Sequence, residues 1–211
     1  MNMLASAQIA RFRNAAIVFA ILSCVASVWA APRNEIRSAN AIGPANAPVL
    51  IEFFSDLQCP QCARYEPIVK SLKKEFGDKV RMVLRHYPLS THEHALPAAW
   101  AAEAAASQGK FWEMAEALYK TQWMWGRAPA PRTIFLDQAK QLGLDLDKFQ
   151  TDMDGPEARA RVVEDQDHAQ AIGVKQAPSV VINGYNVPNA DFSEEGLRAA
   201  IKSALAKAAA Q

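Results

Sequence analysis

Two cysteines separated by two residues are the part of this sequence best suited to chemistry. Cys59-Pro60-Gln61-Cys62 follows a short apolar run and precedes a segment with helical periodicity. A thiolate at Cys59 would meet the free N–H groups and the positive dipole end of that helix, which lower the pKa of the thiol below its usual value of about 8.5. Pro60 suits the first helical turn because it lacks an N–H. We expect Cys59 to be an exposed attacking thiol, and Cys62, one turn inside the helix, to be a sheltered resolving thiol that can close a disulfide with it.

Other interpretations of the cysteine pair are weaker. A structural zinc site would require a second pair, and the third cysteine, Cys24, lies alone near the N-terminus. His92 and His94 are two residues apart and would not share a helix face, so the sequence predicts no metal site and no cofactor. A CxxC motif that is merely structural stays open as an alternative.

Glu52 is a charged residue in the otherwise apolar run 49–54. Burial of a carboxylate in a strand is costly unless a partner or water serves it. Glu52 is therefore either a solvated residue at a strand end or a buried proton relay for Cys62.

The N-terminal segment has the composition of an export signal. Arg11 and Arg13 precede the apolar run 15–30, which is short for a membrane span and ends in Val28-Trp29-Ala30. We expect residues 1–30 to be a signal peptide cleaved after Ala30, with an uncleaved membrane anchor or a lipoprotein modified at Cys24 as alternatives. The chain would then work in a compartment that permits disulfides, periplasmic or otherwise extracytoplasmic.

The distribution of strands and helices predicts one α/β domain with an insertion. Runs 49–54 and 79–87 read as strands on either side of a helix over 60–76, which is a βαβ unit. Helical segments are expected over 90–108, 111–124, 132–142, 146–153 and 157–171, followed by a hairpin turning at Asn183-Gly184 and a helix capped by Ser193. We expect a lead-in at 31–47, an α/β domain at 48–89 and 173–211, and an all-helical insertion at 90–172. The net charge of +1 argues against nucleic acid as a partner.

Three segments together resemble the secreted DsbA-like branch of the thioredoxin superfamily. They are 43–62 (GPANAPVLIEFFSDLQCPQC), 108–113 (QGKFWE) and 173–184 (GVKQAPSVVING), in the same order as in that family. Pro67 resembles the proline inside the active-site helix of the superfamily. The likeness spans roughly residues 41–206.

The resemblance implies a thioredoxin fold with an inserted helical domain, and thiol–disulfide exchange through a redox-active disulfide between Cys59 and Cys62. It implies that Pro178 follows a cis peptide bond beside the sulfurs, where the backbone of its neighbour pairs with a substrate. Gln61 replaces the histidine of the best-known oxidants, which weakens stabilisation of the thiolate. Ala177 precedes the proline where Val or Thr is frequent, which leaves the redox poise and substrate groove open.

The predicted function is donation of disulfides to secreted proteins by an exported oxidoreductase. A disulfide isomerase or reductase uses the same sulfur chemistry, and a non-catalytic peptide-binding chaperone is the alternative from another class. The expected partners are unfolded or reduced exported proteins and a membrane redox partner that reoxidises or reduces the pair. No dimerisation segment is evident, so we expect a monomer.

Overall fold

A computed structural model describes residues 39–189 and 192–210 of the chain, which lie in one compact unit, Ile36–Gln211. The predicted signal peptide or anchor at 1–30 lies outside the described residues, as does the first part of the lead-in, residues 31–38. Within the part that is described, no helix has both the length and the apolar character needed to cross a membrane.

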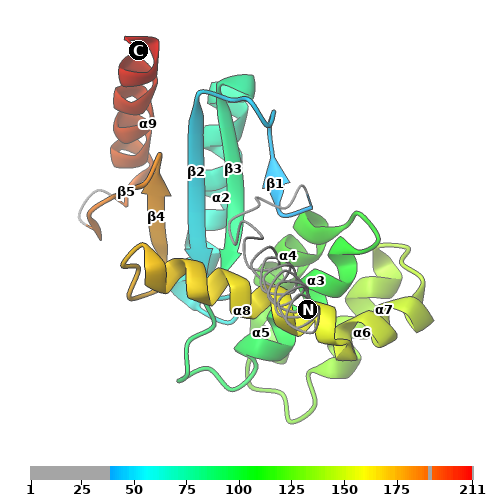
Figure 1. The fold of residues 1–211 in the computed structure, drawn as a ribbon. Coiled ribbons are helices and arrows are strands. Elements are labelled where there is room, and N and C mark those ends of the chain that lie inside the picture. Colours follow the sequence, from blue (N-terminus) through cyan, green and yellow to red (C-terminus); the bar gives the residue numbers. More distant parts are fainter. Residues whose placement is uncertain (1–38, 190–191, 211) are drawn as a thin grey trace, which may run out of the picture. The chain divides into compact units, whose positions relative to one another are not determined.

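The described strands form a single mixed sheet in the order β1-β3-β2-β4-β5 (Figure 1). The central strand β2 runs parallel to β3, with Phe53 opposite Leu84, and antiparallel to β4, with Phe53 opposite Val180. Strands from before and after the helical insertion therefore share one sheet, as expected for a single α/β domain. The strands are β1 (Ala41–Ile42), β2 (Val49–Ser55), β3 (Val80–His86), β4 (Ser179–Ile182) and β5 (Tyr185–Asn186).

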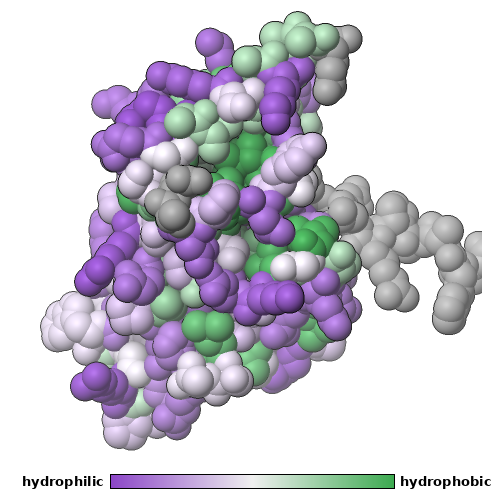
Figure 2. Space-filling view, turned by 90° about the vertical axis from the view of Figure 1, so that its left-hand side faces the viewer, coloured by the Kyte–Doolittle hydropathy of each residue, from purple (hydrophilic) through white to green (hydrophobic). Residues whose placement is uncertain are grey.

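Helices cover both faces of the sheet. Side chains alternate along a strand, so Ile51 and Phe53 of β2 face one side and Glu52 and Phe54 face the other. The first side packs against α2 (Pro60–Phe76) and α9 (Glu194–Ala209), and the second packs against α8 (Pro156–Ala171). Figure 2 shows the α9 side of the molecule, where hydrophobic residues gather over the middle of the surface among hydrophilic ones.

The helices between β3 and β4 pack into a block of their own beside the sheet. Alanine side chains of α3 let neighbouring helices approach closely around the buried Phe111, Trp125, Phe135 and Phe149. Cys59 and Cys62 belong to this core and not to the core beneath the sheet. The helices are α3 (Ala95–Ala106), α4 (Phe111–Lys120), α5 (Gln122–Trp125), α6 (Arg132–Gln141), α7 (Leu146–Asp154) and α8.

The structure corrects three details of the expected elements. Residues 41–42 are not irregular but pair with β3 as strand β1. The helix expected from residue 90 begins later, at Ala95, since His92 and the His94 backbone make tertiary hydrogen bonds instead. The helix expected over 111–124 is interrupted at Thr121, which separates α4 from α5.

Candidate active site

The loop between β2 and α2 is held by the buried carboxylate of Asp56. Its Oδ1 accepts a hydrogen bond from the Gln58 N–H at 2.7 Å, and its Oδ2 accepts one from the Leu89 N–H at 2.9 Å. His92 Nδ1 lies 2.7 Å from the same Oδ2. These contacts join the loop to the chain that follows β3, and so fix where α2 begins.

Two glutamines connect this loop to the helical block. Gln58 donates to the Gly126 carbonyl at 2.8 Å and accepts from the His94 N–H at 2.7 Å. Gln122 of α5 donates to the carbonyls of Leu57 at 2.6 Å and Cys59 at 3.2 Å. The inserted helices therefore position the cysteine pair directly.

Cys59 is the N-cap of α2, with Pro60 as the first helical residue. The pKa of Cys59 is lowered to about 6, mainly because the Cys62 thiol hydrogen bonds to the Cys59 thiolate. Partial burial opposes this shift, while the backbone N–H groups of Cys62 and Gln61 add to it and the charge of Asp56 opposes it weakly. In the reduced protein the thiolate form of Cys59 is therefore favoured at neutral pH.

Cys62 behaves in the opposite way. Its pKa is raised well above the usual range, first because its thiol donates to Cys59 and then because the group is buried. The Ser55 hydroxyl and the Asp56 N–H hydrogen bond to its sulfur and oppose this rise, the N–H at 3.4 Å. Neither cysteine is in a disulfide in this structure. The pair thus consists of one acidic and one protonated sulfur, as exchange through a mixed disulfide requires.

The expected exposure of Cys59 is not found. Cys59 is 6% exposed and Cys62 is 2% exposed, so both are buried and their difference is small. The reason is that the cysteines pack against the core of the helical block. The asymmetry between the two thiols is therefore electrostatic more than steric.

The sequence also predicted three supporting residues around the cysteine pair: Pro178, Ala177 and Gln61. The peptide bond between Ala177 and Pro178 is cis, as expected, and Pro178 lines the same cavity as Cys62. Ala177 packs against the core that contains both cysteines. Gln61 is exposed, and its side chain accepts a hydrogen bond from Arg64 at 3.3 Å; only its backbone N–H serves Cys59.

The structure does not bring Glu52 to the cysteines. Its carboxylate accepts hydrogen bonds from Arg85 Nε at 3.0 Å and Nη2 at 2.9 Å, and lies 3.0 Å from His168 Nε2. Burial of Glu52 rules out a solvated strand end, and its hydrogen-bond partners lie on the face of β2 that α8 covers, opposite α2; the proton relay to Cys62 stays a prediction. The alternation of Glu52 with Ile51 and Phe53 is the signal that could have shown this.

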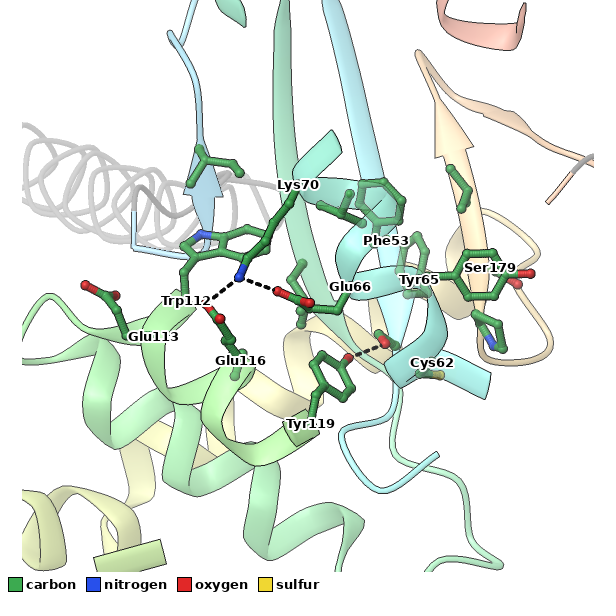
Figure 3. Close-up of a pocket in the computed structure, with 18 residues that line it drawn as sticks. Phe53, Cys62, Tyr65, Glu66, Lys70, Trp112, Glu113, Glu116, Tyr119 and Ser179 are labelled. Atoms are coloured by element: carbon green, nitrogen blue, oxygen red, sulfur yellow. Dashed lines mark hydrogen bonds and ion pairs between the residues drawn. The ribbon is translucent and has the colours of Figure 1, made fainter. Parts of the chain in front are cut away.

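A cavity of about 180 Å³ lies between α2, α4 and the sheet, beside Cys62 (Figure 3). Its walls are mostly apolar and include Phe53, Tyr65 and Trp112, while Lys70 bridges Glu66 and Glu116 at 2.7 and 2.6 Å on one side. Tyr119 lies at the end near Cys62, with its hydroxyl 2.6 Å from Ser55 Oγ. Cys62, the expected resolving thiol, is therefore part of the cavity wall.

Sequence reasoning missed Ser55, Asp56 and Tyr119. Ser55 and Asp56 directly follow the predicted strand 49–54 and directly precede the loop to the cysteines. This position was the signal in the sequence that could have identified them. Tyr119 is 64 residues from Ser55 along the chain, and no local sequence pattern predicts their contact.

Comparisons with known proteins agree with this geometry. A family model described as thioredoxin matches residues 37–203. A thioredoxin-like oxidoreductase from Silicibacter pomeroyi is 30% identical, with a TM-score of 0.67 over 82% of this chain and 93% of that one. BdbD from Bacillus subtilis is 21% identical, with a TM-score of 0.69 over 79% of this chain and 92% of its own, and shows the shared fold. Wolbachia pipientis alpha-DsbA1 is 18% identical, with a TM-score of 0.69 over 81% and 92%.

Similar sequences also occur within much longer proteins. A protein of Salinispora arenicola named Na(+)/H(+) antiporter NhaA 1 is 38% identical over 165 residues, which are 78% of this chain and 24% of that protein. A protein of Herminiimonas arsenicoxydans named Na(+)/H(+) antiporter NhaA is 34% identical over 67% of this chain and 22% of its own length. The chain thus spans about a quarter of these relatives. With the match over residues 37–203, the α/β fold with its helical insertion and the paired cysteines at the start of α2, the chain belongs to the thioredoxin family and shares the fold of the DsbA-like structures.

Proposed function

We propose that this oxidoreductase donates disulfides to exported proteins through the Cys59–Cys62 pair. The observation that carries the proposal is the lowered pKa of Cys59, about 6, beside a protonated Cys62. Stabilising the thiolate stabilises the reduced form of the pair, and this makes the disulfide form a better oxidant.

The chemistry consists of two exchanges. A thiolate of the reduced substrate attacks Cys59 Sγ, the Cys59–Cys62 bond breaks, and its electron pair stays on Cys62. A second substrate thiolate then attacks the substrate sulfur of the mixed disulfide, and Cys59 leaves as a thiolate. The substrate gains one disulfide and the enzyme ends with two reduced sulfurs, so the cycle requires a partner that reoxidises the pair; we propose a membrane redox protein for that role.

The proposed direction is tested by the reduction potential. The reference values are a pKa near 7 with about −270 mV for thioredoxin, and a pKa near 3.5 with about −120 mV for the strong oxidant DsbA. A Cys59 pKa of about 6 places the expected potential between these values, at about −230 mV. Equilibration with glutathione buffers measures it, and a value at or below about −270 mV would assign the chain to reduction instead.

Transfer of the disulfide is tested with a reduced, unfolded secreted protein as substrate. The oxidised enzyme should oxidise the substrate stoichiometrically, and Cys59→Ser should abolish the reaction. If the wild-type protein binds the substrate and prevents its aggregation without changing its thiols, the chaperone alternative is correct.

Export is proposed from the composition of residues 1–30 and the disulfide chemistry of the family. The mature protein should begin at Ala31. N-terminal sequencing of the protein recovered outside the cytoplasm tests this, and an intact N-terminus in the membrane fraction would indicate the anchor alternative.

A further inference from the structure

Two hydrogen-bond donors converge on the sulfur of Cys62. The Asp56 backbone N–H lies 3.4 Å from Cys62 Sγ. The Ser55 hydroxyl lines the same cavity as Cys62 and acts as a hydrogen-bonding group that lowers the pKa of its thiol. Cys62 and both donors are buried. The donors come from the last residue of β2 and the residue after it, so the end of the central strand fixes their direction.

The Ser55 hydroxyl is held in turn by Tyr119 of α4. The two oxygens lie 2.6 Å apart, and Figure 3 shows the tyrosine ring projecting from α4 toward the end of β2. Either hydroxyl can donate in this pair, and when Tyr119 is the donor the single proton of Ser55 is available to the Cys62 sulfur. The phenol can keep this role because burial, first of all, raises the pKa of Tyr119 well above its usual value.

Disulfide exchange places negative charge on Cys62 in both directions. When a substrate thiolate attacks Cys59 Sγ, the bond between the two enzyme sulfurs breaks and its electron pair goes to Cys62, which later takes a proton from water. In the reverse step a Cys62 thiolate attacks Cys59 Sγ and expels the substrate thiolate. Charge on a buried sulfur is costly unless preorganised donors meet it.

We propose that the Ser55 hydroxyl and the Asp56 N–H form a thiolate-stabilising pocket for Cys62, in which Ser55 is a catalytic residue and Tyr119 is a positioning residue. The inference rests on the proposed thiol–disulfide exchange and names the groups that stabilise its second sulfur. The pocket acts only when Cys62 carries charge, so it lowers the barrier for breaking or forming the bond between the two cysteines.

The reaction of the reduced protein with the aromatic disulfide dithionitrobenzoate separates the two sulfurs. Attack by Cys59 releases the first nitrothiobenzoate, and attack by Cys62 on the resulting mixed disulfide releases the second. A Cys62→Ser variant, which should release only one, assigns the two phases. Ser55→Ala should leave the first phase unchanged and slow the second by at least about tenfold, because a hydrogen bond to a charged group is lost.

The Tyr119→Phe variant tests the positioning role. It keeps the ring in place and removes only the hydroxyl, so the second phase should slow by a smaller factor, about threefold. Since Tyr119 acts through Ser55, the same change should have no further effect in a Ser55→Ala background. Ser55→Thr keeps a hydroxyl at a strand end and should restore the second phase toward the wild-type rate.

Ser71→Ala is the matched control. It removes a serine hydroxyl from α2 that donates to Glu194 at 2.7 Å, far along the helix from the cysteines, and should change neither phase. The inference is wrong if Ser55→Ala leaves the second phase at the wild-type rate or slows both phases equally. If the wild-type protein itself shows no second phase, the proposed exchange function fails instead.

Discussion

At the scale of single residues, the reactivity of the site depends on the ionisation of Cys59. The thiol of Cys62, the N–H groups of the first turn of α2 and the charge of Asp56 set a pKa of about 6, while Cys62 stays protonated. The two thiols should therefore react with alkylating reagents in different pH ranges, although their exposures are nearly equal.

Alkylation of the reduced protein by iodoacetamide over a pH series measures this difference. The rate should rise through a midpoint near pH 6 with modification of Cys59 alone, because the nucleophile is the thiolate. The Cys59→Ser variant should stay unmodified until alkaline pH. A midpoint near the ordinary thiol value of about 8.5, or joint modification of both cysteines, would contradict the assignment.

Gln61 is the residue at which thiolate stabilisation can be adjusted with little risk to the fold. Its side chain is exposed, and its contribution to Cys59 is a backbone N–H that every substitution except proline keeps. Gln61→His adds an imidazole that is partly protonated near neutral pH, so the pKa of Cys59 should fall by about one unit. One unit corresponds to about 1.36 kcal/mol, which raises the potential of this two-electron couple by about 30 mV.

Thiolate absorbance and glutathione equilibration on the same proteins test that link. Gln61→Ala is the control, since it removes the amide without adding charge and should leave both values close to wild type. A Gln61→His protein whose pKa falls while its potential stays fixed would show that thiolate stabilisation does not set the redox poise here.

At the scale of elements, the parts of the site that are close in sequence were predictable and the parts that are distant were not. The βαβ unit, the cysteines at the start of α2 and the turn at Asn183-Gly184 follow from local periodicity and turn chemistry. The contacts from Asp56 to His92 and from Ser55 to Tyr119 depend on how α3 and α4 dock, which no local pattern encodes. The start of α3 was missed for the same reason.

Glu52 belongs to a buried network of charges between the sheet and α8. Arg85 bonds Glu52 on one side and Asp165 at 3.1 Å on the other, and His168 completes the contacts of Glu52. This network joins β2 and β3 to the helix that closes the insertion. These contacts give Glu52 a structural role. We therefore expect its substitution to affect stability and not proton transfer to Cys62.

Glu52→Gln should therefore destabilise the protein and leave its chemistry unchanged. Removing one charge of a buried pair costs roughly 3–5 kcal/mol, and we expect the lower end because Asp165 still pairs with Arg85. Denaturant unfolding measures the loss. Glu75→Gln, which breaks the more exposed pair with Arg198, is the control and should cost no more than about 1 kcal/mol. A stable Glu52→Gln protein with slowed resolution by Cys62 would support the relay.

At the scale of the whole molecule, ionisation of the active site is coupled to folding. The unfolded chain has ordinary thiols with pKa values near 8.5. In the folded reduced protein the pKa of Cys59 is lower and that of Cys62 is higher than this value. The oxidised protein has neither thiol, so the difference in stability between the two redox forms isolates this contribution from all other titrations.

The stability of the reduced form relative to the oxidised form should rise between about pH 6 and pH 8.5 and then decline. Below pH 6 Cys59 is protonated in folded and unfolded chains alike, so it adds nothing. Between these limits the unfolded chain binds one proton more than the folded chain, and stability rises with pH. Above about 8.5 the Cys59 contribution is complete, whereas Cys62 ionises only in the unfolded chain and lowers stability.

Thermal unfolding of both forms measures the difference, which should grow by at least about 2 °C from pH 6 to pH 8.5, since each kcal/mol moves the Tm of a protein of this size by about 2–4 °C. A Cys59→Ala protein cannot form the disulfide, so its stability is compared with that of the oxidised wild type and should not rise relative to it between pH 6 and pH 8.5. A rise that survives this substitution, or a flat difference in the wild type, would mean that Cys59 is not the acidic group of the folded protein.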